Sequence, residues 1–274
     1  MNFEVVPASE LPFTEQAATF TAAFAGYLAG SMEMDAAGLA RFISLQGADL
    51  FYSRFVKDRN GALAGFGYIN RTANVPRLAA MGTIPAARRT GAATHLLAHL
   101  LDEARARHDQ AMVLEVFEQN GPAHALYQRH GFRELTRLFG WRHQNEAAGA
   151  KRNDLRELNL LSVLQMNSAP AFPEIPWQIS RHIVAKLSAV RAFSLGRIAV
   201  VVGDPAVPPV RVHAFLGEED WRERKDLMSA LCAEFPGCGF FAPPIFPENF
   251  GNEIFAPLGF VREPLNQFLM RRDL

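Results

Sequence analysis

The chain has 274 residues, of which 49% are hydrophobic and 20% charged. This is an ordinary globular composition, and it excludes a collagen-like, coiled-coil or wholly disordered protein. At about 150 residues per domain, the length favours two domains over one. The 28 basic residues balance 28 acidic ones, so no basic excess is available to bind nucleic acid and we expect no nucleic-acid partner.

The cysteines and the first residues indicate the cellular setting. Cys232 and Cys238 are too few for a disulfide framework and lack the spacing of a zinc site, so we expect no metal. Residues 1–15 do not show a basic segment followed by an apolar core, and no uncharged run reaches about 18 residues. These features predict a cytoplasmic protein that is neither secreted nor bound to a membrane.

The first half of the chain predicts one mixed α/β unit. Apolar residues at helical or alternating spacing define its elements. In chain order these are a helix over 14–28, a helix from Asp35, strands over 51–57, 63–70 and 77–84, a helix over 91–108, a strand over 112–117, a helix over 122–129 and a strand over 132–141.

After a polar linker at 144–152, the second half repeats the order strand, helix, strand of the first. Its predicted elements are helices over 155–165 and 179–192 around a proline-bearing loop, strands over 197–202 and 210–216, a helix over 221–235 and a strand near Phe240. Near the end of each half, residues 126–132 (LYQRHGF) match residues 254–260 (IFAPLGF). We therefore expect a degenerate duplication, with domains over 1–144 and 153–274.

The segment 85–94 (PAARRTGAAT) lies where a strand is expected to end and a helix to begin. Free N–H groups and the positive end of a helix dipole make such junctions anion-binding sites. Gly91 and the two alanines after it let a ligand approach the backbone, while Arg88 and Arg89 offer forked donors suited to phosphate. An ordinary helix start with two solvated arginines explains the same residues, so this segment alone leaves both readings open.

A second segment, 114–132, follows at the distance of one helix and one strand. Together the two resemble the GNAT superfamily of acyl-CoA N-acyltransferases, whose diphosphate loop reads R/Q-x-x-G-x-G/A and whose later block reads L-x-V-x-x-x-N-x-x-A-x-x-L-Y-x-x-x-G-F. Residues 88–93 (RRTGAA) fit the loop. The residues at matching places in the block are Asn120, Ala123, Leu126, Tyr127, Gly131 and Phe132. The resemblance covers residues 3–143 and implies an α/β fold (α+β mixed sheet) of tandem acyl-CoA N-acyltransferase-like domains.

The resemblance implies transfer of an acetyl group from acetyl-CoA to a primary amine, in a small molecule or a peptide, within one ternary complex. The implied cofactor contacts are Met81, Gly82 and Thr83 with the pantetheine arm, Arg88, Arg89, Thr90, Gly91, Ala92, Ala93 and Thr94 with the diphosphate, and Asn120 near the pantetheine arm. A strand-edge N–H near Gly82 could stabilise the oxyanion, and Tyr127 would protonate the departing thiolate. A core aromatic residue is the alternative for Tyr127.

The general base is less well defined, because the strand over 77–84 lacks the acidic residues that many family members place there. Glu115 is the best substitute, since some ribosomal-protein N-terminal acetyltransferases of the superfamily carry their base five residues before the asparagine of the block. A solvated or ion-paired strand residue explains Glu115 equally well. Glu33 and Asp35, between the first two helices, are weaker candidates.

The second copy is expected neither to bind a diphosphate nor to catalyse the reaction. At the position of Arg88 and Arg89 the second copy has the acidic segment 217–221 (GEEDW), which would repel a diphosphate. At the position of Tyr127 it has Phe255, which lacks a hydroxyl. It resembles the decayed copy of tandem superfamily members. We expect it to pack against the first copy, with the loop 170–177 as one wall of the acceptor pocket, in a monomer or a homodimer. A non-catalytic acyl-CoA-binding module and a protein N-terminal acetyltransferase are the alternative functions.

Overall fold

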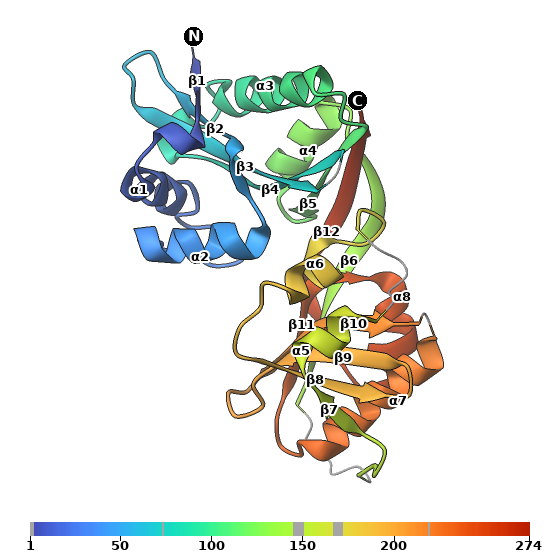
Figure 1. Ribbon diagram of the computed structural model, residues 1–274. Coiled ribbons are helices and arrows are strands. Elements are labelled where there is room, and N and C mark those ends of the chain that lie inside the picture. Colours follow the sequence, from blue (N-terminus) through green and yellow to red (C-terminus); the bar gives the residue numbers. More distant parts are fainter. Residues whose placement is uncertain (1–2, 73, 145–150, 167–171, 219) are drawn as a thin grey trace. The chain divides into compact units, whose positions relative to one another are not determined.

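The computed structural model describes residues 3–72, 74–144, 151–166, 172–218 and 220–274 (Figure 1). The chain divides into two compact units, and each combines a β-sheet with helices. Unit 1 contains Met1–Leu135 and Leu269–Leu274, and unit 2 contains Thr136–Phe268. The expected mixed α/β class is therefore confirmed. Most of the expected linker, residues 145–150, lies outside the described residues.

Unit 1 is built on a mixed sheet with the strand order β1-β2-β3-β4-β5-β12. Its strands are β1 (Glu4–Pro7), β2 (Asp49–Lys57), β3 (Leu63–Thr72), β4 (Val75–Thr83), β5 (Ala111–Phe117) and the end of β12 (Val261–Asp273). The first four strands pair antiparallel, whereas β4 and β5 pair parallel. A parallel pair needs a crossover connection, and the helix α3 (Ala92–Ala106) supplies it.

The helices of unit 1 begin and end at local signals. They are α1 (Phe13–Ala23), α2 (Ala36–Gln46), α3 (Ala92–Ala106) and α4 (Gly121–Arg129). The Asp35 side chain accepts from the N–H of Gly38 and starts α2, and Gly47 in the left-handed region ends it. The helix predicted over 14–28 was too long, because the chain turns after Ala23 and Gly26 adopts a φ of 66°.

The core of unit 1 lies on both faces of the sheet. On one face, Phe66 of β3 stacks on Phe20 of α1 with ring centroids 5.1 Å apart. On the other face, a Cβ at Gly67 would lie 2.8 Å from Leu100 of α3. Successive residues of a strand point to opposite faces, so α1 and α3 cover opposite sides of the sheet.

Unit 2 has the strand order β12-β6-β11-β10-β9-β8-β7. Its strands are β6 (Arg133–His143), β7 (Arg156–Leu158), β8 (Val190–Leu195), β9 (Ile198–Gly203), β10 (Val210–Gly217), β11 (Phe240–Pro247) and most of β12. Its α-helices are α5 (Leu160–Leu164), α6 (Arg181–Val184), α7 (Trp221–Glu234) and α8 (Glu248–Phe250). As in unit 1, the two strands flanking the long helix, β10 and β11, pair parallel.

Two predicted helices of unit 2 were wrong in part. Within 155–165 the chain forms the strand β7 before the short α5, and within 179–192 it forms only α6 before β8 begins at Val190. Their apolar residues recur at helical spacing, but β7 and β8 pair with each other and β8 pairs with β9. Strand pairing thus overrides the local pattern. No described helix has both the length and the apolar character that crossing a membrane requires.

Each unit contains a strand from the other half of the sequence. From Thr136 onward β6 belongs to unit 2, where it pairs antiparallel with β11. The last residues of β12 belong to unit 1, where the N–H of Leu274 donates to the carbonyl of Gln110 at 3.1 Å. Domains with boundaries at 144 and 153 remain a prediction from the sequence copies.

Replacing Gly65 by alanine should destabilise unit 1. A Cβ at this position would lie 2.6 Å from the carbonyl oxygen of Gly82, so β3 and β4 must separate locally. We expect a loss of about 1–3 kcal/mol, as for other overpacked sites, measured by urea unfolding. Gly121→Ala is the matched control, because a Cβ there meets nothing within 4 Å. Equal stability of the two variants would contradict this account.

Candidate functional site

The strands β4 and β5 part in the middle of the unit 1 sheet. They pair only at Arg77 with Val113 and at Leu78 with Leu114, although β4 continues to Thr83 and β5 to Phe117. The register between β3 and β4 shifts at the same level, between Leu78 and Ala80. This irregularity twists β4 away from its parallel neighbour and leaves an open strand edge.

The open edge of β4 presents backbone N–H groups. Thr83 and Met81 are paired in register with β3, and the N–H of Ile84 donates to the carbonyl of Ala64 on the β3 side. Because N–H groups alternate between the two sides of a strand, Thr83 and Met81 direct theirs to the β5 side. Gly82, between them, lies against α1, where a Cβ would come within 2.9 Å of Ala23. The sequence-predicted group Met81–Thr83 therefore lies on the open edge.

An ion pair spans β4 and β5 where they part. Arg77 of β4 donates to both carboxylate oxygens of Glu115 on β5, at distances from 2.6 to 3.1 Å. The two side chains are 2% and 4% exposed. The guanidinium also donates to the side chain of Gln46, at the end of α2. The structure thus favours the ion-paired alternative for Glu115 over the role of a free base.

The loop before α3 presents a run of unbonded backbone N–H groups. Within the described ranges, the six N–H groups from Arg89 to Thr94 have no hydrogen-bond partner, and the first bonded amide is that of His95. Arg89 and Gly91 adopt positive φ angles of 64° and 97°. Left-handed residues in such turns direct successive N–H groups into one anion-binding concavity. Positive φ is uncommon for arginine, and strained residues cluster at functional sites.

The two arginines of this loop have different partners. Arg88 donates to the carbonyl of Ala23 at 3.1 Å, at the end of α1. Arg89 is exposed and, considering only the described part of the chain, has no hydrogen-bond or ion-pair partner. Thr90 is also engaged, since its hydroxyl donates to the carbonyl of Ala87. Arg89 is therefore the side chain of the loop that is available to a ligand.

Asn120 and Tyr127 belong to the segment after β5, where Asn120 precedes α4 and Tyr127 lies about two helical turns later. Asn120 caps the helix, and its side chain accepts from the N–H of Ala123 at 3.4 Å. Tyr127 is 7% exposed and packs on Phe132, with ring centroids 5.8 Å apart. Its hydroxyl makes no hydrogen bond to any residue that the structure describes. It remains available to donate to a ligand.

Tyr27 joins this cluster from the segment between α1 and α2. Its ring contacts Phe24 and Phe117 at centroid distances of 4.9 and 6.0 Å. Burial raises the pKa of the Tyr27 hydroxyl, and a hydrogen bond with the Asn120 side chain opposes part of this shift. The helix predicted over 14–28 included Tyr27, so the sequence did not single out this residue as part of a site. Glu33 and Asp35 are exposed in the same segment, and Asp35 caps α2.

The electrostatic environment keeps Tyr127 protonated. Burial, and secondarily the neighbouring Tyr27, raise the pKa of the Tyr127 hydroxyl above the ordinary value of tyrosine. A phenol in this state holds its proton at neutral pH and beyond. Tyr127 is therefore a buried, protonated phenol in the second half of α4, next to Tyr27.

The described residues of unit 2 do not show the corresponding features. At the start of α7 the Asp220 carboxylate accepts from the N–H of Glu223 at 2.9 Å and so occupies the helix N-terminus. Glu218 pairs with Arg197 at 2.6 Å, while Glu219 lies outside the described residues. Phe255 is fully buried among aromatic rings, among them Phe246 at 5.4 Å. The second copy offers neither a free anion site nor a phenol at these positions.

Comparisons with known proteins agree with this geometry. Residues 23–132 match the family model described as the acetyltransferase (GNAT) family. None of the curated proteins matches the chain. Among solved structures, a proposed acetyltransferase from Pyrococcus horikoshii has a TM-score of 0.63 and 13% identity over 100% of this chain and 89% of its own.

Two further solved structures are similar over nearly the whole chain. A GCN5-related N-acetyltransferase from Anabaena variabilis has a TM-score of 0.65 and 15% identity, over 99% of this chain and 73% of its own. A tandem GNAT protein from the clavulanic acid biosynthesis pathway has a TM-score of 0.61 and 15% identity, over 99% and 98%. At these identities the likeness concerns the fold. Residues 23–132 therefore belong to the GNAT acetyltransferase family, and the chain has the tandem GNAT fold.

Substitution at the ion pair separates a structural role of Glu115 from a catalytic one. Glu115→Gln leaves the buried Arg77 without its counter-charge, and removing one partner of such a pair costs about 3–5 kcal/mol. The double variant Arg77→Met with Glu115→Leu removes both charges and should regain most of the stability in urea unfolding. If Glu115 is only structural, the double variant also regains acyl-transfer activity. A stable but inactive double variant would restore the base hypothesis.

Proposed function

We propose that this chain is an N-acetyltransferase that transfers the acetyl group of acetyl-CoA directly to a primary amine in a ternary complex. The observation that carries the proposal is the run of unbonded N–H groups from Arg89 to Thr94, placed where β4 and β5 part. A helix start with unbonded amides attracts a diphosphate, and an open strand edge beside it suits the amides of a pantetheine arm. Membership of residues 23–132 in the GNAT family supports the same reading.

Binding uses main-chain groups first. The amides of Arg89–Thr94 hold the diphosphate and the free Arg89 guanidinium adds a charged donor, whereas Arg88 is committed to α1. The edge groups of Met81 and Thr83 pair with the pantetheine arm. The Asn120 side chain already accepts from the N–H of Ala123 and bonds with Tyr27. A side-chain amide can make further hydrogen bonds, and these contact the same arm.

The chemistry needs few side chains. Acetyl-CoA, when bound, supplies a thioester whose carbonyl oxygen gains negative charge as the amine attacks and whose sulfur leaves as a thiolate. An N–H of the open β4 edge, near Gly82, stabilises that oxygen. Tyr127 donates its proton to the sulfur. Its raised pKa keeps the phenol protonated at neutral pH before this step.

The acceptor enters along the segment between α1 and α2. This segment brings Tyr27 to Asn120 and carries the exposed Glu33 and Asp35. Glu115 serves as base only when it leaves Arg77, so Glu33 becomes the second candidate. The engagement of Glu115 also favours the alternative of a non-catalytic acyl-CoA-binding module. Release of free thiol in a panel of small amines and peptides separates that module from an enzyme, and a small-molecule acceptor from a protein N-terminus.

The two adjacent arginines provide a matched test of the loop. Arg89→Ala removes a free charged donor and should weaken acetyl-CoA binding about tenfold or more, which corresponds to a charged hydrogen bond of about 1.5–3 kcal/mol. Arg88→Ala removes a bond to Ala23 and should lower stability with a smaller effect on affinity. Isothermal titration with acetyl-CoA measures both. Undetectable binding by the unmodified protein would overturn the proposed function.

The phenol of Tyr127 can be tested against that of Tyr27. Tyr127→Phe should lower turnover about a hundredfold, within the range for one acid catalyst, with little change in acetyl-CoA affinity. Tyr27→Phe is the control, because it removes a neighbouring buried hydroxyl but leaves the donor, and turnover should fall less than tenfold. Since the pKa of Tyr127 is raised, the unmodified enzyme should lose no activity through this residue up to about pH 10. An unchanged rate in Tyr127→Phe removes it from the mechanism.

A further inference from the structure

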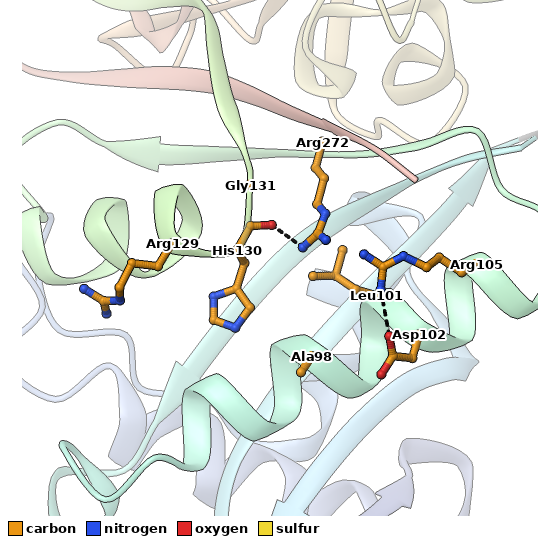
Figure 2. Close-up of a pocket in the computed structure, with 8 residues that line it drawn as sticks. All are labelled: Ala98, Leu101, Asp102, Arg105, Arg129, His130, Gly131 and Arg272. Carbon is orange, nitrogen blue, oxygen red and sulfur yellow. Dashed lines mark hydrogen bonds and ion pairs between the residues drawn. The ribbon is translucent and has the colours of Figure 1, made fainter.

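Unit 1 contains a cavity of about 430 Å³ between the C-terminal half of α3 and the end of α4. Figure 2 shows its walls: Ala98, Asp102 and Arg105 come from α3, Arg129 and His130 from the end of α4, and Arg272 from β12. The free amides of Arg89–Thr94 lie at the opposite end of α3. The cavity is therefore a separate place on the same helix.

Positive charge dominates this cavity. Three arginines, Arg105, Arg129 and Arg272, and one carboxylate, that of Asp102, belong to its lining. Arg105 is paired with Asp102 at 2.7 Å, and Arg272 donates to the neutral carbonyl of His130. Arg129 has no hydrogen-bond or ion-pair partner in the described portion of the chain. The lining thus has two positive charges more than its carboxylate neutralises.

The ends of the two helices do not account for all of these arginines. The partial negative charge at a helix C-terminus attracts one cation, which explains Arg105 on α3 and Arg129 on α4. Arg272 comes from a strand and adds a third guanidinium to the same space. Burial and repulsion from Arg105 lower the pKa of Arg272, so these charges repel one another. An anion in the cavity would relieve this repulsion.

One face of α3 connects the cavity with the free amides. Thr94, Ala98, Leu101 and Arg105 recur at intervals of three or four residues and so share a helix face. Ala98 lies seven residues after Gly91, about 10 Å further along the helix axis. Its small side chain leaves room beside the His130 ring (Figure 2). A ligand whose diphosphate occupies the loop could extend along this face into the cavity.

We propose that this cavity binds a phosphomonoester, supplied either by the 3′-phosphate of a coenzyme A whose diphosphate occupies the Arg89–Thr94 loop or by a free phosphorylated compound. The first source rests on the proposed function. Arginine suits the role because its planar fork can bond two phosphate oxygens at once. Arg129, which has no partner among the residues that the structure describes, makes the main contact, and Arg272 adds charge from β12.

Titration with coenzyme A and with dephospho-coenzyme A, which lacks only the 3′-phosphate, tests the first source. The unmodified protein should bind coenzyme A about tenfold more tightly or better. In Arg129→Gln this ratio should fall toward one while affinity for dephospho-coenzyme A stays the same. Arg59→Gln, at an exposed turn far along the chain from the cavity residues, is the control and should keep the ratio. Circular dichroism confirms that the variants are folded.

Titration with adenosine 3′-phosphate tests the second source. If the two coenzymes bind equally well, the first source is wrong although the proposed function stands. Saturable binding of adenosine 3′-phosphate that Arg129→Gln abolishes would then support a site for a free phosphorylated compound. If adenosine 3′-phosphate also fails to bind, the inference is overturned. If neither coenzyme binds, the proposed function fails, and the adenosine 3′-phosphate titration alone decides for or against the cavity.

Discussion

The ion pair between Arg77 and Glu115 is the constraint on which the candidate site depends. It joins β4 and β5 at the last level where these strands are paired, and through Gln46 it also holds the end of α2. A buried pair of charges has a desolvation penalty that its attraction recovers only with good geometry and further hydrogen bonds. Here the pair holds the strands together at one level, beyond which they diverge. The amides of the α3 loop and the cluster on α4 lie on either side of that opening.

Local features of the site were readable from the sequence, whereas long-range ones were not. The loop around Gly91 was indicated by its residue types at a junction of strand and helix, and the block from Asn120 to Phe132 by its resemblance to the GNAT superfamily; both are short continuous segments. Arg77 could not be paired with Glu115 in this way, because the two lie 38 residues apart and meet only through the parallel register of β4 and β5. Tyr27 was hidden for another reason: its spacing from Phe24 fits a helix, but the helix has already ended.

The same distinction applies to the fold. Strong periodicity predicted α3, α7 and the strands beside them, whereas no strand was predicted at β1 or β12, the first and last strands of the chain. In unit 2 the differences from the candidate site of unit 1 are also local and visible in the sequence. The Asp220 side chain caps α7, whereas no side chain caps α3. At the position of Tyr127 unit 2 has Phe255, which has no hydroxyl and packs among aromatic rings. The second copy thus keeps the parallel β10–β11 pair without an anion site at its helix start.

The final strand, β12, begins in unit 2 and ends in unit 1, so unit 1 depends on residues from the C-terminus of the chain. Residues 269–274 are the last in the sequence, yet they belong to the unit that holds the loop and Tyr127. Proteolytic cleavage or a premature stop codon near the C-terminus would therefore destabilise unit 1, although most of unit 1 comes from the N-terminal half of the sequence. Loss of β12 would also expose the edge of β5, which could then pair with a strand of another chain. Unit 1 as the structure defines it therefore cannot be obtained by truncating the chain after Leu135.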